Sequence, residues 1–236
     1  VRKLTDISGH AVRCMYLYCG MTDVAALRNN TEYIDALNRL WNDVTLRNMY
    51  ITGGIGSSKH NEGVTKDYDL PNLEAYCETC ASVGMVFWNH RMNQITGDAK
   101  YIDILERSMY NGVLAGISLS GDRFFYVNPL ESKGDHHRQE WYGCACCPSQ
   151  LSRFLPTIGN YIYAISDDAL WVNLYIGNTT RFTLNGDNVI LRQETNYPWD
   201  GSVKLTVSST KDLDKEIRLR IPGWCKNYTI TINGKE

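Results

Sequence analysis

Residues 81–97 read ASVGMVFWNHRMNQITG, and this stretch sets the helical character of the first part of the chain. Its apolar side chains recur at the spacing of one helix face, at Ala81, Met85, Trp88, Met92 and Ile95. Gly97 then supplies a helix stop, and the same spacing restarts after Asp98 and continues to Val113. Two helices joined at a single glycine predict an antiparallel helical pair.

The same period appears on both sides of this pair. Residues 8–27 and 31–46 are predicted helices, and Asn30-Thr31 marks the start of the second. Residues 147–165 are also predicted to be helical, with a kink or interruption at Pro156. A short hairpin is expected around Gly121-Asp122.

Beyond Ser166 the apolar pattern changes to a period of two. The predicted strands cover residues 169–175, 180–184, 189–195, 203–207, 217–221 and 228–232. Six strands without an intervening helix predict an antiparallel β-sandwich, with the domain boundary near Asp167-Asp168. The expected fold class is therefore multi-domain, α then β, with a helical domain at 1–166 and a β-sandwich domain, truncated, at 167–236.

Bulk composition narrows the class of function. The chain has 236 residues, 43% of them hydrophobic, which is enough for a hydrophobic core. Its net charge is -2 and it has no run of Lys or Arg, so it offers no basic surface for nucleic acid. No apolar span reaches membrane length, and the opening Val-Arg-Lys-Leu-Thr-Asp has neither an initiator methionine nor a signal peptide. The last residues, 232–236, hold an Asn-Gly hairpin turn without its return strand. We expect a piece of a larger protein, cut at both ends.

The eight cysteines are too few for a disulfide scaffold in a chain of this size. Their concentration in the middle of the chain is typical of metal or catalytic use in a reducing compartment, so a cytoplasmic location is expected. Four of them are predicted to be buried apolar residues: Cys14, Cys19, Cys77 and Cys225.

Three other thiols and a carboxylate form a chemically sensible zinc site, namely Cys80, Cys146, Cys147 and Glu78. Residues two apart on a helix point to different sides, so we expect Glu78 and Cys80 in an irregular segment that leads to a helix beginning near Ala81. The adjacent ligands Cys146 and Cys147 likewise require irregular backbone. From the ligand count alone a closed structural zinc site is favoured over a catalytic one. Buried thiols without a metal are a second alternative.

Glu62 stands in a polar, glycine-rich loop at residues 52–72, and loops of that length are usually functional. A glycosidase that retains configuration needs a nucleophile and an acid that later acts as a base, and here sulfur would replace the usual carboxylate nucleophile. The alternative for Glu62 is an ordinary surface carboxylate. His10 could equally be a core histidine or a sugar-binding residue, and Tyr126 a packing aromatic or a sugar contact.

Several motifs together resemble glycoside hydrolase family 127, the β-L-arabinofuranosidases. They run in family order and comprise Ser8-Gly9-His10-Ala11-Val12-Arg13, Gly53-Gly54-Ile55-Gly56, His60-Asn61-Glu62, Asp67-Tyr68-Asp69-Leu70-Pro71-Asn72, Glu78-Thr79-Cys80-Ala81-Ser82, Phe125-Tyr126-Val127-Asn128-Pro129-Leu130 and Cys144-Ala145-Cys146-Cys147-Pro148. The family is far longer than this chain, so the resemblance implies the second half of an (α/α)6 barrel followed by β-sandwich domains.

The resemblance also implies roles for particular residues. It places a zinc ion on Glu78, Cys80, Cys146 and Cys147, makes Cys146 the nucleophile that forms a thioglycosyl intermediate, and makes Glu62 the acid/base. It places His10 and Tyr126 in the sugar pocket.

The leading hypothesis is thus a fragment of an exo-acting, zinc-dependent retaining glycoside hydrolase whose partner is a small carbohydrate, a terminal arabinofuranoside or related sugar. Neither nucleic acid nor a membrane is an expected partner, and a homodimer is left open. The competing hypothesis is a carbohydrate-binding or assembly module with a purely structural zinc. A third is a thiol-dependent acyl hydrolase using Cys146 and His10, which neighbouring metal-binding thiols disfavour.

Overall fold

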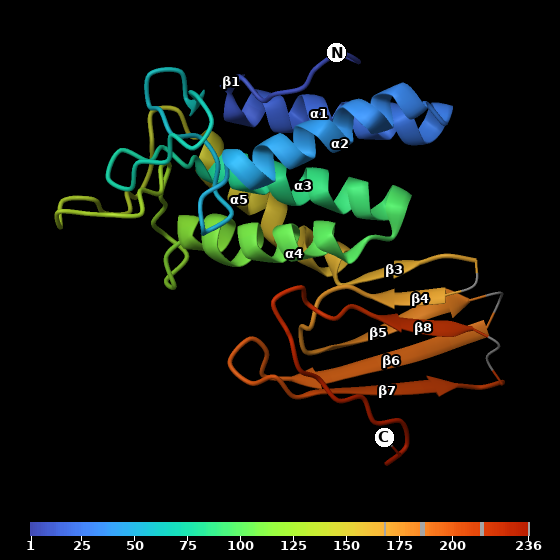
Figure 1. Cartoon of the computed structure of the whole chain (residues 1–236). Helices are drawn as coiled ribbons and strands as arrows, with labels where there is room; N and C mark the ends of the chain where they lie inside the picture. Colours follow the sequence, from blue (N-terminus) through green and yellow to red (C-terminus); the bar gives the residue numbers. More distant parts are fainter. Residues whose placement is uncertain (168, 185–186, 213–214, 236) are drawn as a thin grey trace. The chain divides into compact units, whose positions relative to one another are not determined.

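A computed structural model describes residues 1–167, 169–184, 187–212 and 215–235, drawn in Figure 1. The chain divides into two compact units, residues 1–156 and 157–236, and each is described by itself. The predicted boundary near Asp167-Asp168 stays a prediction, and Asp168 lies outside the described residues.

The first unit is helical, as predicted. Its elements are β1 (Gly9–His10), α1 (Ala11–Arg28), α2 (Thr31–Arg47), β2 (Gly63–Val64), α3 (Thr79–Thr96), α4 (Ala99–Ser108), a π-helical turn (Met109–Val113), a 3-10 turn (Leu114–Gly116) and α5 (Cys146–Phe154). A 3-10 segment, Leu155–Tyr161, follows α5 and crosses into the second unit, so the interruption expected at Pro156 is confirmed.

Helix α3 is the centre of the first unit. It packs against α1, α4 and α5, and in Figure 1 its ribbon lies between α1 and α4. It is enclosed over its first half, where residues 79–86 are all buried, and Met85, Trp88 and Met92 are fully buried. Gly84 lets α1 approach closely, since a Cβ there would come within 2.6 Å of the Met15 side chain.

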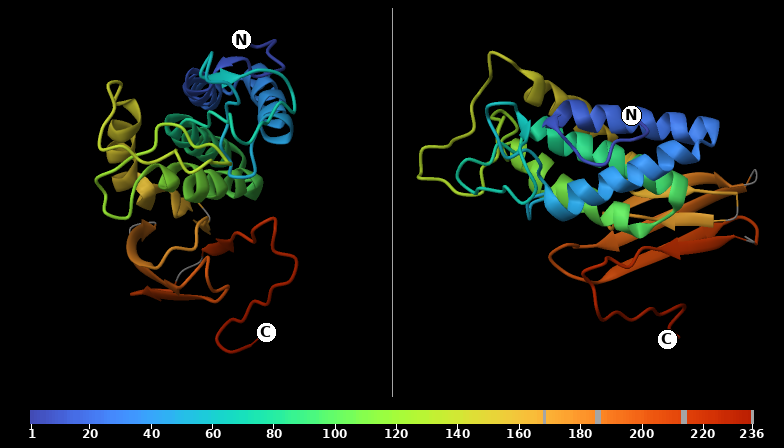
Figure 2. Two further views of the ribbon diagram at one scale, coloured as in Figure 1. Left: turned by 90° about the vertical axis from the view of Figure 1, so that its left-hand side faces the viewer. Right: turned by 45° about the horizontal axis from the view of Figure 1, so that its top comes forward.

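Two long connections gather at the end of the unit where α1, α3 and α5 begin (Figure 2, right). One joins α2 to α3 and carries β2, and the other joins the turns after α4 to α5. The hairpin expected around Gly121-Asp122 is reduced to one antiparallel bridge, between Ile117 and Phe124, and a separate bridge links Phe124 to Gln139. The loops therefore surround the helix starts that carry the predicted site residues.

The second unit consists of two three-stranded sheets. Their strands are β3 (Tyr163–Ile165), β4 (Ala169–Val172), β5 (Asn178–Leu184), β6 (Asp187–Thr195), β7 (Val203–Ser209) and β8 (Glu216–Leu219). The sheet orders are β3-β4-β8 and β5-β6-β7, and a shared apolar cluster around Leu170, Val172, Tyr175 and Leu191 fills the space between them. All pairs are antiparallel except β4 with β8, which is parallel.

Two predictions about this part of the chain were wrong in detail. Residues 163–165 form β3 instead of helix, because Tyr163 and Ile165 pair with β4. Residues 228–232 form no strand, and only Ile232 pairs, in one bridge to Lys235. The Asn-Gly turn inside that bridge is confirmed, since Asn233 and Gly234 have φ of 51° and 80°, as a tight hairpin turn requires.

Among the described residues, no helix has the length and apolar character needed to cross a membrane.

Candidate metal centre and neighbouring carboxylates

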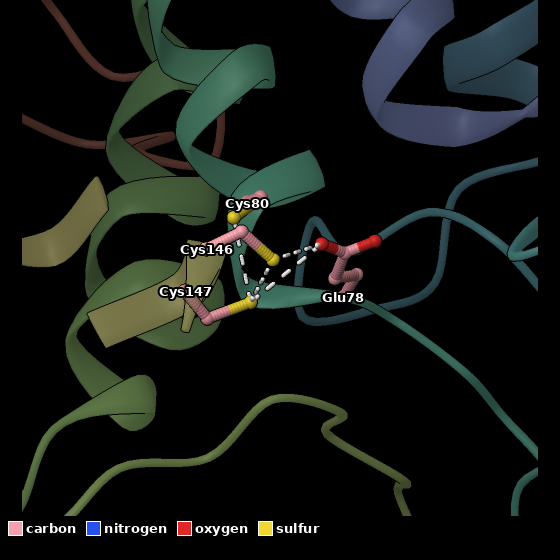
Figure 3. Close-up of side chains that lie close together, drawn as sticks. All are labelled: Glu78, Cys80, Cys146 and Cys147. Atoms are coloured by element: carbon pink, nitrogen blue, oxygen red, sulfur yellow. Dashed lines mark hydrogen bonds between the residues drawn. The ribbon is translucent and has the colours of Figure 1, made fainter. Parts of the chain in front are cut away.

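The four predicted metal ligands come together at the starts of two helices (Figure 3). Glu78 and Cys80 lie at the beginning of α3, and Cys146 and Cys147 are the first two residues of α5. One donor atom from each of the four side chains lies within 4.8 Å of all the others. The Sγ atom of Cys147 is 3.4 Å from that of Cys80 and 4.0 Å from that of Cys146.

The backbone conformation of the cysteines in this cluster differs from the one expected. Only Glu78 is extended, with φ of -58° and ψ of 134°, as the residue before α3. Cys80 is already in the first helical turn, and both Cys146 and Cys147 are helical. Neighbouring residues on a helix are only about 100° apart around its axis, so adjacent thiols can still converge on one point. The prediction of irregular backbone at these three cysteines was wrong.

Glu78 connects the thiols to a second group of polar side chains. Its Oε1 atom accepts from the Cys146 and Cys147 thiols, each at 3.6 Å, while its Oε2 atom is buried with no hydrogen-bond partner among the described residues. Only 2% of the residue is exposed. A buried carboxylate oxygen without a partner indicates a place where a ligand or ion is to be bound.

The electrostatics of the cluster favour a cation. Burial raises the pKa of the Glu78 carboxyl, and burial together with nearby acidic groups raises the pKa of Cys146 to about 12. The pKa of Cys147 is also raised, first by its hydrogen bond with Cys80 and then by burial. Four acidic groups this close cannot all be ionised without positive charge among them. Three thiolates and a carboxylate therefore fit a divalent metal that binds soft sulfur ligands.

Tyr126 contacts the cluster from the connection before α5. Its hydroxyl oxygen accepts from the Cys146 thiol at 3.1 Å, and its backbone carbonyl accepts from the Thr79 amide at 2.9 Å. Burial raises the pKa of the Tyr126 hydroxyl, so it stays protonated and can donate to a sulfur that has lost its proton. The tyrosine is thus a polar contact of Cys146 as well as a packing residue.

Glu62 is held against His10 by a short antiparallel pair, β1 with β2. Oε2 of Glu62 lies 3.1 Å from Nε2 of His10, and the Glu62 carbonyl accepts from the Ala11 amide. Gly63 makes this pairing possible, because a Cβ there would lie 1.8 Å from the Gly9 carbonyl oxygen. Glu62 itself has φ of 51°, an unfavourable backbone conformation for a residue other than glycine.

His10, Glu62 and Glu78 form a second set whose donor atoms lie within 4.8 Å of one another. Glu78 belongs to both sets, so the seven predicted site residues are brought into one continuous group. Their individual roles stay predictions. Of the four cysteines expected to be buried, Cys19 and Cys77 are buried, but Cys14 and Cys225 are partly exposed.

Two further polar residues reach the same group and were given no role from the sequence. Tyr142 accepts from the Tyr126 amide at 3.2 Å and donates to the Phe124 carbonyl. Asn128 bonds the chain on both sides of Glu78. The signal for Asn128 was its place in the motif Phe125-Tyr126-Val127-Asn128-Pro129-Leu130, whereas nothing in the spacing distinguishes Tyr142.

Comparison with known proteins shows the family of this chain. Residues 1–160 match the GH127 catalytic domain of beta-L-arabinofuranosidases, and residues 169–236 match the GH127 middle domain. The chain therefore belongs to glycoside hydrolase family 127, the beta-L-arabinofuranosidase family. Its helical unit is a portion of the catalytic barrel, and its sheets belong to the middle domain.

The relatives are longer proteins. The chain is 40% identical to a non-reducing end beta-L-arabinofuranosidase of Bifidobacterium longum subsp. longum, an alignment that covers 100% of this chain and 38% of that protein. It is 47% identical, with a TM-score of 0.95, to the crystal structure of a GH127 beta-L-arabinofuranosidase from Geobacillus stearothermophilus T6, covering 99% of this chain and 39% of that one. A second solved GH127 beta-arabinofuranosidase is 46% identical, with a TM-score of 0.92, over 95% of this chain and 35% of that chain. The chain spans less than half the length of each.

Proposed function

We propose that this chain carries the catalytic residues of a zinc-dependent retaining glycoside hydrolase that releases a terminal β-L-arabinofuranose or a related sugar. One observation carries the assignment of the nucleophile: Cys146 is the only partly exposed donor in the cluster, while Glu78, Cys80 and Cys147 are buried. A sulfur that must reach a sugar has to be accessible. The relatives' names support the choice of sugar.

In the first step, the Cys146 sulfur attacks the anomeric carbon and forms a carbon–sulfur bond as the bond to the leaving oxygen breaks. Glu62 gives its proton to that oxygen. In the second step, the Glu62 carboxylate takes a proton from water, the water oxygen bonds to the anomeric carbon, and the sulfur leaves as a thiolate. His10, in contact with Glu62, orients its carboxyl, and Tyr126 donates to the sulfur when it is ionised.

Glu78, Cys80, Cys146 and Cys147 would hold the zinc ion. Bound there, zinc would keep the Cys146 sulfur deprotonated at neutral pH, against the raised pKa that burial imposes on the thiol. The Oε2 atom of Glu78, unpartnered among the described residues, points away from the thiols in Figure 3, and a sugar hydroxyl could donate to it there.

The proposal is tested by trapping the intermediate. The zinc-loaded protein is incubated with an arabinofuranose analogue that carries an electrophile at the anomeric carbon, and the product is digested for peptide mass spectrometry. We expect one adduct, on Cys146, and none in Cys146→Ala. Cys225→Ala is the matched control and should label like the unmodified protein, since Cys225 lies in the other unit. Labelling on Cys144 or on no cysteine would remove the proposed nucleophile.

A closed shell of four protein donors also favours a second candidate, a purely structural zinc in a carbohydrate-binding module. Chelation separates the two. If the metal is catalytic, a chelator should abolish turnover at concentrations at which circular dichroism still reports folded helices, and zinc should restore it. If the metal is structural, helix content and turnover should fall together.

A further inference from the structure

Asn128, in the connection before α5, bonds the chain on both sides of Glu78. Its Nδ2 atom donates to the Cys77 carbonyl at 2.9 Å and to Thr79 Oγ1 at 3.0 Å, and its backbone amide donates to the Tyr76 carbonyl at 3.2 Å. The side-chain orientation is fixed by chemistry, because a carbonyl oxygen can only accept. The residues before and after Glu78 are therefore held by one amide group.

The chain around Glu78 needs such a contact. Cys77 has φ of 38°, a left-handed conformation that costs energy for any residue with a Cβ, and Glu78 is extended before α3 begins. Thr79 is tied further, since its hydroxyl donates to the Phe125 carbonyl at 2.8 Å. Loss of the Asn128 amide would remove the hydrogen bond that it donates to the carbonyl of Cys77 in this strained turn.

The carboxylate itself makes few contacts that could hold it. Among the described residues, its Oε1 atom accepts hydrogen bonds from two thiols, each at 3.6 Å, and its Oε2 atom has no hydrogen-bond partner. The position of the carboxylate must then follow from the backbone on either side of it. We propose that Asn128 is a positioning residue that places the Glu78 carboxylate on the metal, an inference that rests on the proposed metal site.

An ordinary structural role would be the alternative, and the second unit offers a matched control. Gln193 is a buried amide whose Nε2 donates to the Tyr163 hydroxyl and to the carbonyls of Leu174 and Ile176, while its Oε1, like Oδ1 of Asn128, has no partner among the described residues. Gln193→Ala therefore removes a comparable set of bonds at a place that holds no proposed ligand.

The experiment measures zinc affinity and ligand geometry without turnover. Asn128→Ala, Asn128→Asp and Gln193→Ala are made in the reduced protein, and the zinc dissociation constant is found by competition with a chromophoric chelator. Asn128→Asp keeps the shape but turns an acceptor towards the Cys77 carbonyl. We expect about 10- to 100-fold weaker zinc binding in both Asn128 variants and less than about twofold in Gln193→Ala.

Cobalt(II) substitution reports which ligand moves. Its ligand-field bands respond to the donor set, so the spectra of the Asn128 variants should approach that of Glu78→Ala, while Gln193→Ala keeps the unmodified spectrum. Unchanged affinity and spectra in the Asn128 variants would overturn the inference, as would equal weakening by Gln193→Ala or failure of both Asn128 variants to fold. If the unmodified protein binds neither zinc nor cobalt, the proposed function fails with it, and that outcome is distinguishable from the others.

Discussion

Each of the two units contains a buried charged side chain, but the surroundings of these two side chains differ. Arg220 in the second unit is 5% exposed, and its Nε atom donates to the Asn173 carbonyl at 2.6 Å. Glu78 in the helical unit is equally buried, yet it faces thiols and leaves one oxygen without a hydrogen-bond partner among the described residues. A buried charge bonded to backbone stabilises a fold, whereas acidic groups gathered around an unpartnered oxygen make a site for a ligand.

The backbone shows the same difference. Around the site, Glu62 and Cys77 both have positive φ, and Gly63 lies so close to Gly9 that no side chain fits. The second unit is instead built from regular ladders, such as the seven-residue pairing of β5 with β6. Two of the five positive-φ residues other than glycine that the described part of the chain contains, Glu62 and Cys77, thus lie at the site, at a cost that the structure around them offsets.

The largest effect is expected from Glu62→Ala, with Glu194→Ala as its counterpart in the other unit. The two carboxylates are similarly exposed, at 43% and 42% of the side chain, and both contact a basic residue. Loss of the acid/base should lower kcat about 10²- to 10⁴-fold, and azide should restore part of it, while Glu194→Ala stays near the unmodified rate. Unchanged turnover in Glu62→Ala would exclude Glu62 as the acid/base.

Gly63→Ala tests whether backbone placement of Glu62 matters. The new Cβ would collide with the Gly9 carbonyl, so β1 and β2 must separate and Glu62 must leave His10. A displacement of about 1 Å costs roughly 100-fold in kcat. Gly177→Ala is the control in the second unit, since its Cβ would find its nearest atom at 3.7 Å, an ordinary contact. Equal rates in the two variants would show that the β1–β2 pair does not position Glu62.

The smallest effect concerns acid stability. Burial lowers the pKa of His90, on α3, to about 4, whereas the unfolded chain has the ordinary value near 6.5. Below that value the unfolded state binds a proton that the folded state does not, so stability falls as pH drops towards 4. We expect a loss of about 2 kcal/mol between pH 7 and pH 5, reduced in His90→Gln.

Urea unfolding measures this loss of folding stability. A chelator in the buffer removes bound metal beforehand, so that metal release does not contribute to the measured pH dependence. The second unit contains no histidine, so the helical signal at 222 nm should carry the pH dependence. A His90→Gln variant with the same pH slope as the unmodified chain would contradict the assignment.

The period of the apolar residues was sufficient to predict most elements. Helical spacing at Met85, Trp88 and Met92 identified α3, because those side chains face the core of the unit on every turn. The period fails where pairing with a distant segment decides the outcome. Tyr163–Ile165 is a strand only because β4 lies beside it. Residues 228–232 have strand-like residues, but among the described residues they pair only through the bridge of Ile232 to Lys235.

For the site, the sequence by itself determined the chemical inventory. Three thiols, a carboxylate and the family motifs around them were readable from residue types and order, because ligand preference depends on the donor atom. Tertiary structure alone decided that Glu78 belongs to both polar groups, that Gly63 holds Glu62 to His10, and that Asn128 bonds both sides of Glu78. These are contacts between segments up to some 70 residues apart, as between Glu78 and Cys147, and only the packing of the chain fixes such distances.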